Sequence, residues 1–211
     1  MLGGMLRIVV VALVVLVAAM FLLPRGERGA PPQTATVLPA PRELADVSLV
    51  DETGQPIRFS DFEGGFSLLF FGFTNCPDIC PLTLQVLAAT RAEIVARAPN
   101  LAPRVVFVSV DPNRDTPERI ATYLDNFDPE FLGVTAPDDA LAPLLAALGV
   151  AVEKHEHGGA NYNVVHNSAI YLLDPNADWI AVTTAPHDPK IIASDYLRIR
   201  RRHQGGTPPD A

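Results

Sequence analysis

Short apolar runs recur along the central part of the chain, separated by polar and mixed stretches. Residues 66–73 and 105–110 are almost entirely apolar runs of strand length, each with a single serine. Such runs are typical of strands that are covered on both faces of a sheet. Further strands are predicted at residues 131–135, 168–173 and 179–183, and a hairpin is predicted to join residues 48–50 to 57–59. The pattern therefore predicts a buried central sheet with hairpins in it.

Helical spacing of apolar residues appears between these strands. The predicted helices cover residues 82–97, 116–127, 138–148 and 189–202. Thr116 and Pro117 form a helix-start signal, and Gly149 is a typical stop. Strands that alternate with helices and then end in a hairpin and a helix predict an α/β fold. We expect a mixed central sheet flanked by helices, in the layout of a thioredoxin-like domain.

The N-terminal end has a different composition. Residues 8–23 are an unbroken apolar run of 16 residues, which is short for a spanning helix and long for a signal-peptide core. We expect an uncleaved signal anchor, with a cleaved signal peptide as the alternative. Residues 1–7 would then be the cytoplasmic end, and the rest of the chain would face a periplasm-like compartment. The predicted location is the inner, cytoplasmic membrane, with a single-pass anchor.

Between the anchor and the domain, residues 24–44 are rich in proline, and we predict an extended tether there. The domain itself is predicted over residues 45–203, and residues 204–211 are predicted to be a disordered tail.

Charge narrows the range of partners. The chain carries 16 Lys and Arg residues against 24 Asp and Glu residues, a formal net charge of −8. An acidic protein is repelled by phosphate, so no nucleic-acid partner is expected. The basic cluster at residues 198–203 ends the last predicted helix, where positive charge complements the helix dipole.

The chain has two cysteines, Cys76 and Cys80, at the junction of a predicted buried strand and a predicted helix. A helix N-terminus favours thiolate over thiol, and thiolate is the form that binds metal or attacks a disulfide. A structural disulfide is the alternative in an exported protein. A bridge that closes so short a loop adds little stability, which favours a functional pair.

Two soft thiolates select Cu(I) or Zn(II), and an imidazole is a natural third ligand. His166 is the best-placed histidine, because the loop into the strand that follows it should lie beside the cysteine loop. His155 and His157 could form an accessory metal site, although a solvated polar loop fits their surroundings better. His187 is expected to be structural.

Three segments together resemble the Sco/SenC family of copper chaperones for cytochrome c oxidase assembly. The segments are residues 71–81 (FGFTNCPDICP), 107–118 (FVSVDPNRDTPE) and 165–175 (VHNSAIYLLDP). The resemblance implies that Cys76, Cys80 and His166 bind copper as Cu(I) or Cu(II). It also implies delivery to cytochrome c oxidase subunit II or another copper acceptor.

The chain departs from the family pattern on either side of the histidine. Val165 stands where an aspartate is common, and Asn167 replaces a more common Ser or Thr. An acceptor that orients the histidine from outside the ligand shell is therefore missing, which could alter copper affinity or redox potential.

A second function stays open at the same site. Cys76 could attack, and Cys80 resolve, a disulfide of the acceptor, which would make the protein a membrane-tethered thiol–disulfide oxidoreductase. Redox motifs usually have two residues between their cysteines, whereas this pair has three, which favours a metal. A peroxidase or redox sensor is a third reading with no distinctive feature in the sequence. An enzymatic role is expected only if the pair is redox-active.

Overall fold

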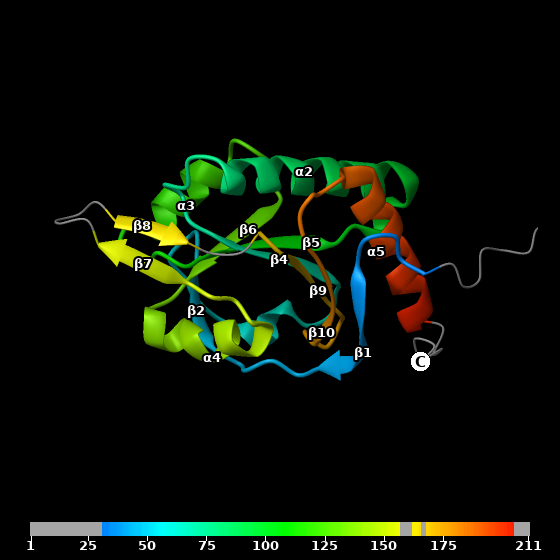
Figure 1. The fold of residues 1–211 in the computed structure, drawn as a ribbon, viewed down its shortest axis with the longest axis horizontal. Helices are drawn as coiled ribbons and strands as arrows, with labels where there is room; N and C mark the ends of the chain where they lie inside the picture. Colours follow the sequence, from blue (N-terminus) through cyan, green and yellow to red (C-terminus); the bar gives the residue numbers. More distant parts are fainter. Residues whose placement is uncertain (1–30, 157–161, 166–167, 205–211) are drawn as a thin grey trace, which may run out of the picture. The chain divides into compact units, whose positions relative to one another are not determined.

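A single mixed sheet organises the part of the chain that the computed structural model describes, residues 31–156, 162–165 and 168–204 (Figure 1). The sheet has eight strands in the order β1-β10-β9-β4-β5-β6-β2-β3. Its strands are β1 (Thr36–Arg42), β2 (Ser48–Asp51), β3 (Pro56–Arg58), β4 (Ser67–Gly72), β5 (Arg104–Ser109), β6 (Phe131–Thr135), β9 (Ile170–Leu173) and β10 (Trp179–Thr183). A separate hairpin pairs β7 (Glu153–Glu156) with β8 (Tyr162–Val165). The predicted α/β sheet and its hairpins are confirmed.

Three parallel strands end together at one edge of the sheet. In β4, β5 and β6 the aligned last residues are Gly72, Ser109 and Thr135. Strand β9 runs antiparallel to β4 and begins beside this edge, with Ile170 opposite Phe70. Loops that follow β4 and β5 and the loop that leads into β9 therefore lie at the same end of the domain. This is where α/β sheets gather functional residues.

Helices cover both faces of the sheet. They are α2 (Ile79–Arg97), α3 (Pro117–Leu124), α4 (Asp138–Leu148) and α5 (Pro189–Gln204), with short 3₁₀ helices η1 (Phe59–Phe62) and η2 (Pro99–Leu101). Helices α2 and α5 pack together, and Figure 1 shows β4 and β5 running between α2 on one side and α4 on the other. Thr116 caps α3 by accepting a hydrogen bond from the Arg119 amide, and Gly149 ends α4 in the left-handed conformation at φ 68°. Both helix-boundary signals are confirmed.

The core lies where the continuous apolar runs predicted it. Every residue of β4 is buried, and so is every residue of β5 after Arg104. Phenylalanines fill much of the interior, and the Phe70 and Phe107 rings of the two neighbouring strands pack 6.2 Å apart. Strands β4 and β5, which are covered on both faces of the sheet, thus carry the loops that hold the candidate site.

Part of the segment predicted to be a tether, residues 24–44, belongs to the folded domain. Residues 36–42 form β1, an edge strand that pairs antiparallel with β10. Just before it, the buried carboxylate of Asp195 in α5 accepts hydrogen bonds from the backbone amides of Gln33, Thr34 and Ala35 at 2.7–3.1 Å. The folded domain therefore begins near residue 33, and the prediction that it begins at residue 45 is corrected.

The predicted anchor at residues 8–23 lies outside the described residues, as do residues 205–211 of the predicted tail. Within the described part of the chain, α2 is the one helix long and apolar enough to cross a membrane. It buries Leu84, Leu87 and Ile94 in the domain, so we interpret it as a core helix.

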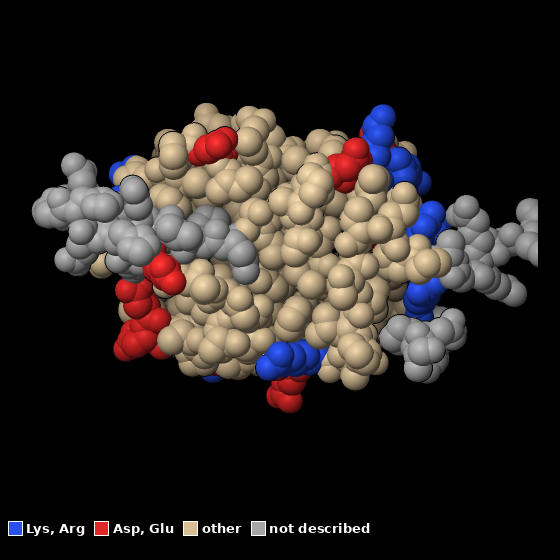
Figure 2. Space-filling view, viewed as in Figure 1, with Lys and Arg blue, Asp and Glu red and all other residues tan. Residues whose placement is uncertain are grey.

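Charge is unevenly distributed over the domain. Figure 2 shows acidic side chains gathered beside α4 and β7, and basic side chains over α5, with a broad uncharged surface between them. The last turn of α5 holds Arg201, Arg202 and His203, which matches the expected complement to its dipole.

Candidate functional site

The cysteine pair lies where β4 gives way to α2. Cys76 is in the connecting loop and is 9% exposed, whereas Cys80 is in the first turn of α2 and is fully buried. The helix begins at Ile79, so Pro81 is its third residue and not the first, as the sequence suggested. This position still lies in the first turn, where a backbone N–H has no partner within the helix.

Both cysteines are reduced, and the two residues contact each other. The Cys80 backbone N–H donates to the Cys76 Sγ at 3.3 Å. A side-chain hydrogen bond with Cys76 is the largest cause that raises the pKa of Cys80, and burial is the next. The expectation that the helix N-terminus would favour thiolate at both cysteines is therefore wrong for Cys80. The surroundings of Cys80 therefore disfavour its thiolate, while the Cys76 sulfur accepts from the Cys80 backbone N–H.

A glycine lies directly beneath the buried sulfur. A Cβ on Gly72 would come 3.2 Å from the Cys80 Sγ and 2.7 Å from Cε2 of Phe107. Such distances are shorter than ordinary carbon contacts of about 3.5–4.0 Å. The end of β4 thus has room for the sulfur because residue 72 has no side chain.

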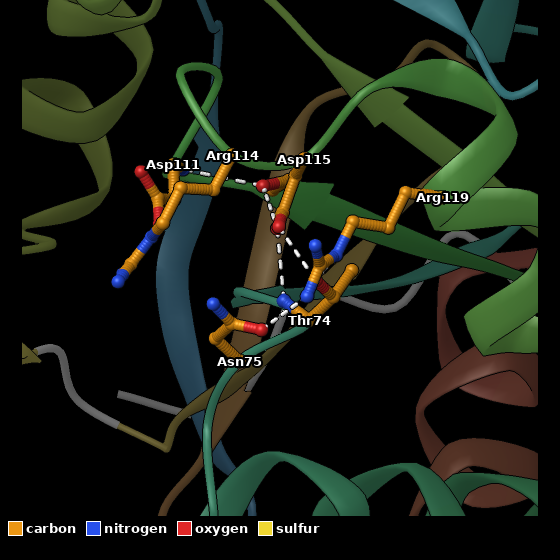
Figure 3. A network of polar contacts seen from close by, with 7 residues as sticks. Thr74, Asn75, Asp111, Arg114, Asp115 and Arg119 are labelled. Atoms are coloured by element: carbon orange, nitrogen blue, oxygen red, sulfur yellow. Dashed lines mark hydrogen bonds and ion pairs between the residues drawn. The ribbon is translucent and has the colours of Figure 1, made fainter. Parts of the chain in front are cut away.

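A buried carboxylate holds the cysteine loop from the other side (Figure 3). Asp115 follows β5 and is fully buried. It accepts hydrogen bonds from the Thr74 backbone N–H at 2.8 Å, from the Thr74 hydroxyl at 2.6 Å and from the Ser109 hydroxyl at 2.6 Å. A buried carboxylate with three donors is a stable arrangement, and it fixes the chain two residues before Cys76.

Helix α3 reaches the same loop through Arg119. Its Nε donates to the Thr74 hydroxyl at 2.7 Å, and its guanidinium also donates to the Asn75 side-chain carbonyl (Figure 3). The loop before Cys76 is therefore held both by the strand β5 end and by α3. An exposed cation next to the cysteine loop is a further consequence of this arrangement.

An ion pair lies in the loop after β5, next to the segment that leads to Cys76. Arg114 donates to the buried carboxylate of Asp111, and its guanidinium lies 5.9 Å from the centre of the Phe73 ring. Phe73 is the first residue after β4. The loop after β5 therefore contacts both Phe73 and Thr74 in the segment that leads to Cys76.

The predicted third ligand, His166, lies outside the described residues, and so does His157. For His155, in β7, the backbone alone is described. The described chain resumes at Ser168, whose carbonyl oxygen is 2.7 Å from Nε2 of His187. This contact supports the structural role expected of His187. Among the described residues no group of three His, Cys, Asp or Glu side chains is arranged to hold a metal ion.

The sequence pointed to the two cysteines but not to the residues that hold them. Thr116 acts as the helix cap it was expected to be, and the Asp115 backbone N–H closes the turn after β5 by donating to the Asp111 carbonyl. The carboxylate of Asp115 also contacts Thr74, 41 positions away. The available signal was its place just after the second buried strand, at the sheet edge where sites gather.

The fold and site together define a thioredoxin-like α/β domain with a cysteine pair at the start of its first long helix. Comparison with known proteins agrees. The family model described as SCO1/SenC matches residues 37–200, and the chain belongs to this family. It is 32% identical over 149 residues to an SCO2-like protein of Rickettsia felis, covering 70% of this chain and 72% of that protein.

Solved structures of the family are similar in fold. Arabidopsis thaliana ScoI with copper bound matches with a TM-score of 0.69 and 30% identity, covering 74% of this chain and 98% of that one. Apo Sco1 of Thermus thermophilus matches with a TM-score of 0.72 and 30% identity, covering 82% and 99%. These likenesses confirm both the predicted fold class and the predicted family.

Proposed function

We propose that this protein is a copper chaperone that binds one copper ion through Cys76, Cys80 and His166. The observation that carries the proposal is the contact of two reduced cysteines at the end of β4, with the Cys80 N–H donating to the Cys76 sulfur at 3.3 Å. Two cysteines so close together can bind one soft metal ion, and thiolates favour Cu(I). The copper-bound Arabidopsis relative supports the same cargo.

The topology supports His166 as the third ligand. Strand β9 pairs with β4, and Ile170 lies opposite Phe70, a few residues before the cysteine loop. His166 precedes β9 by four positions, so its loop leads into the sheet next to the strand that carries the cysteines. An imidazole with two thiolates suits Cu(I), and it also suits Cu(II) when water or another ligand is added.

The proposed acceptor is subunit II of cytochrome c oxidase or another apo copper protein at the outer face of the inner membrane. The support is the family resemblance, together with the apolar run at residues 8–23 as an anchor. A tether in the same membrane raises the effective concentration of such a partner.

The test is an anaerobic Cu(I) titration of the reduced domain, residues 31–211, against a chelator of known affinity. We expect one tightly held copper per domain. His166→Ala should weaken binding, and His187→Ala is the matched control because that imidazole contacts the Ser168 carbonyl. Equal affinities of wild type and His166→Ala would remove His166 from the site.

The contact between the two cysteines also favours a second function, thiol–disulfide exchange. In that reaction Cys76 attacks an acceptor disulfide to form a mixed disulfide, and Cys80 then displaces the acceptor thiol. The acceptor gains two thiols and the chain gains a Cys76–Cys80 disulfide. A domain that holds no copper but reduces a disulfide of the acceptor would establish this alternative, and a domain that retains copper and leaves the acceptor disulfide intact would exclude it.

A further inference from the structure

The loop that carries Cys76 is held by a charged side chain from another element, Arg119 of α3 (Figure 3). The Nε of this arginine donates to the Thr74 hydroxyl at 2.7 Å, and a terminal nitrogen of its guanidinium donates to the Asn75 side-chain carbonyl. Thr74 and Asn75 are the two residues directly before Cys76. One planar guanidinium therefore holds two consecutive residues of the cysteine loop, a task that its rigid fork of donors suits.

Thr74 links this arginine to a buried carboxylate. The Thr74 hydroxyl accepts from Arg119 and donates to Asp115 at 2.6 Å, and the Thr74 backbone N–H donates to the same carboxylate at 2.8 Å. A hydroxyl that donates to one charged group and accepts from another has its orientation fixed. The turn is closed by the Cys76 backbone N–H, which donates to the Phe73 carbonyl at 3.2 Å. This short loop is thus held through both its backbone and its side chains.

Arg119 differs from Asp115 in its exposure. Asp115 is fully buried, so its removal leaves buried donors without a partner, whereas Arg119 is an exposed residue. Removing an exposed side chain usually costs little stability, because water replaces the lost hydrogen bonds. A substitution at residue 119 also keeps the backbone N–H that Thr116 caps. A role of Arg119 in placing the cysteine loop can therefore be separated from a role in folding.

We propose that Arg119 is a positioning residue for the candidate copper site, which holds the Cys76 loop where its sulfur meets the start of α2. The inference rests on the proposed copper-binding function and adds a residue outside the proposed ligand set. Cys76 lies in a loop whereas Cys80 is in the first turn of α2, so the geometry between the two cysteines depends on the path of the loop. Replacing residues that orient metal ligands from outside commonly lowers metal affinity by about 10- to 100-fold.

The test separates the geometry of the guanidinium from its charge. Arg119→Lys keeps the positive charge but replaces the planar fork with a single ammonium group, whereas Arg119→Gln removes the charge. Arg97→Lys and Arg97→Gln are the matched controls. Arg97 is the last residue of α2, at the opposite end from the cysteines, and it pairs with Glu93 at 2.9 Å.

Four quantities are measured on the full chain in a mild detergent. The melting temperature and the amide exchange rate of Cys76 are measured without metal. Cu(I) affinity is measured by chelator competition, and the Cu(II) form is examined by its sulfur-to-copper absorption band. This band depends on the geometry of the copper–sulfur bonds, which a merely structural role of Arg119 would leave unchanged.

We expect both Arg119 variants to lower the Cu(I) affinity roughly 10-fold, to shift the absorption band and to speed amide exchange at Cys76. The reason is that neither new side chain can hold Thr74 and Asn75 together as the guanidinium does. Their melting temperatures should stay within about 2 °C of wild type, as is usual for an exposed position. Both Arg97 variants should match wild type in amide exchange, affinity and absorption band.

Wild-type affinity and absorption band in both Arg119 variants would overturn the inference while leaving copper binding by the wild type intact. A loss in Arg119→Gln with full recovery in Arg119→Lys would also overturn it, since charge and not geometry would be the cause. A loss of affinity that only accompanies a fall in melting temperature would overturn it as well, because the role would be structural. Failure of the wild type to bind copper would overturn both this inference and the proposed function.

Discussion

At the scale of single residues, the site depends on close packing beneath one sulfur. Gly72 lets the Cys80 sulfur rest on the end of β4, next to the Phe107 ring. A side chain there would push the sulfur, the ring or the strand away. Because the Cys80 backbone N–H donates to the Cys76 sulfur, a displaced Cys80 also changes its geometry with Cys76.

Gly72→Ala is therefore expected to lower the free energy of unfolding by about 1–3 kcal/mol, the usual cost of overpacking a core. Copper affinity should fall as well. Urea denaturation and Cu(I) competition measure the two effects. Gly65→Ala is the matched control, because a Cβ at Gly65 would meet nothing within 4 Å. Equal behaviour of the two variants would show that Gly72 is not needed for the sulfur.

Asp115→Ala removes the acceptor for three donors on Thr74 and Ser109. Leaving buried donors without a partner is costly, and we expect a loss of about 2–4 kcal/mol in the free energy of unfolding. Asp125→Ala, at an exposed position at the end of α3, should change stability by less than about 0.5 kcal/mol. A loss in Asp115→Ala no larger than that of the control would mean that the Thr74 loop is held by other contacts.

The cysteines could be predicted from the sequence because rare residue types occur there in a recognisable pattern. Asp115 could not be placed in the same way. Its partner Thr74 is 41 positions away, and only the pairing of β4 with β5 brings the two together.

At the scale of elements, most predicted strands and helices agree with the structure to within a few residues. The exceptions are the hairpin of β7 and β8, where a polar loop was favoured around His155, and β1, which lies in the segment predicted to be a tether. It contains Pro39 and Pro41 and is mostly exposed, and it pairs along one side only, with β10. Proline is tolerated on edge strands because an unpaired N–H is not needed there. The proline-rich composition therefore indicated a linker, but pairing with β10 makes the segment a strand.

The start of the domain is held by α5 through Asp195. Asp195→Asn replaces an acceptor-only side chain with one that carries a single acceptor oxygen, so the amides of residues 33–35 cannot all remain bonded. We expect faster amide hydrogen exchange over residues 33–42, with the Cys76 loop unaffected.

Asp188→Asn on the same helix is the matched control. Asp188 accepts from the backbone N–H groups of Lys190 and Ile191 at the start of α5, and asparagine is an equally good cap. Unchanged exchange in Asp195→Asn would mean that pairing of β1 with β10 suffices to hold the chain.

The turn between β9 and β10 predicts a pH effect. Burial is the largest cause that raises the pKa of Asp178, followed by the charge of Asp174. The folded state thus binds the proton more tightly than the unfolded state does. This stabilising contribution is present below the ordinary Asp pKa of about 3.9 and is lost as pH rises through the folded-state value.

Asp178→Asn mimics the protonated side chain. We expect a higher melting temperature than wild type at pH 7 and no difference near pH 3, where the wild-type carboxyl is also protonated. Calorimetry at the two pH values measures this. A gain of equal size at both pH values would assign the effect to packing and not to charge.

At the scale of the whole molecule, the corrected start of the domain changes how it would work at a membrane. If residues 8–23 are an anchor, only residues 24–32 remain as a tether, because Asp195 binds the chain from residue 33 onward. Nine extended residues reach about 30 Å, against about 70 Å for the 21 residues first predicted. In that case a short tether would keep the domain within reach of the membrane and raise the effective concentration of an acceptor anchored there.

This arrangement predicts two behaviours that fractionation can separate. The full chain should stay in the membrane pellet after carbonate extraction, because an apolar helix resists removal by high pH. The domain of residues 31–211 should be soluble and bind copper with the same affinity, since the described core lies within it. Replacing Val14 and Val15 by Asp should release the full chain from the pellet, because charges in the middle of an apolar run oppose insertion. A wild-type protein recovered soluble with an N-terminus near residue 30 would instead show a cleaved signal peptide, and delivery would then depend on diffusion of the free domain to its acceptor.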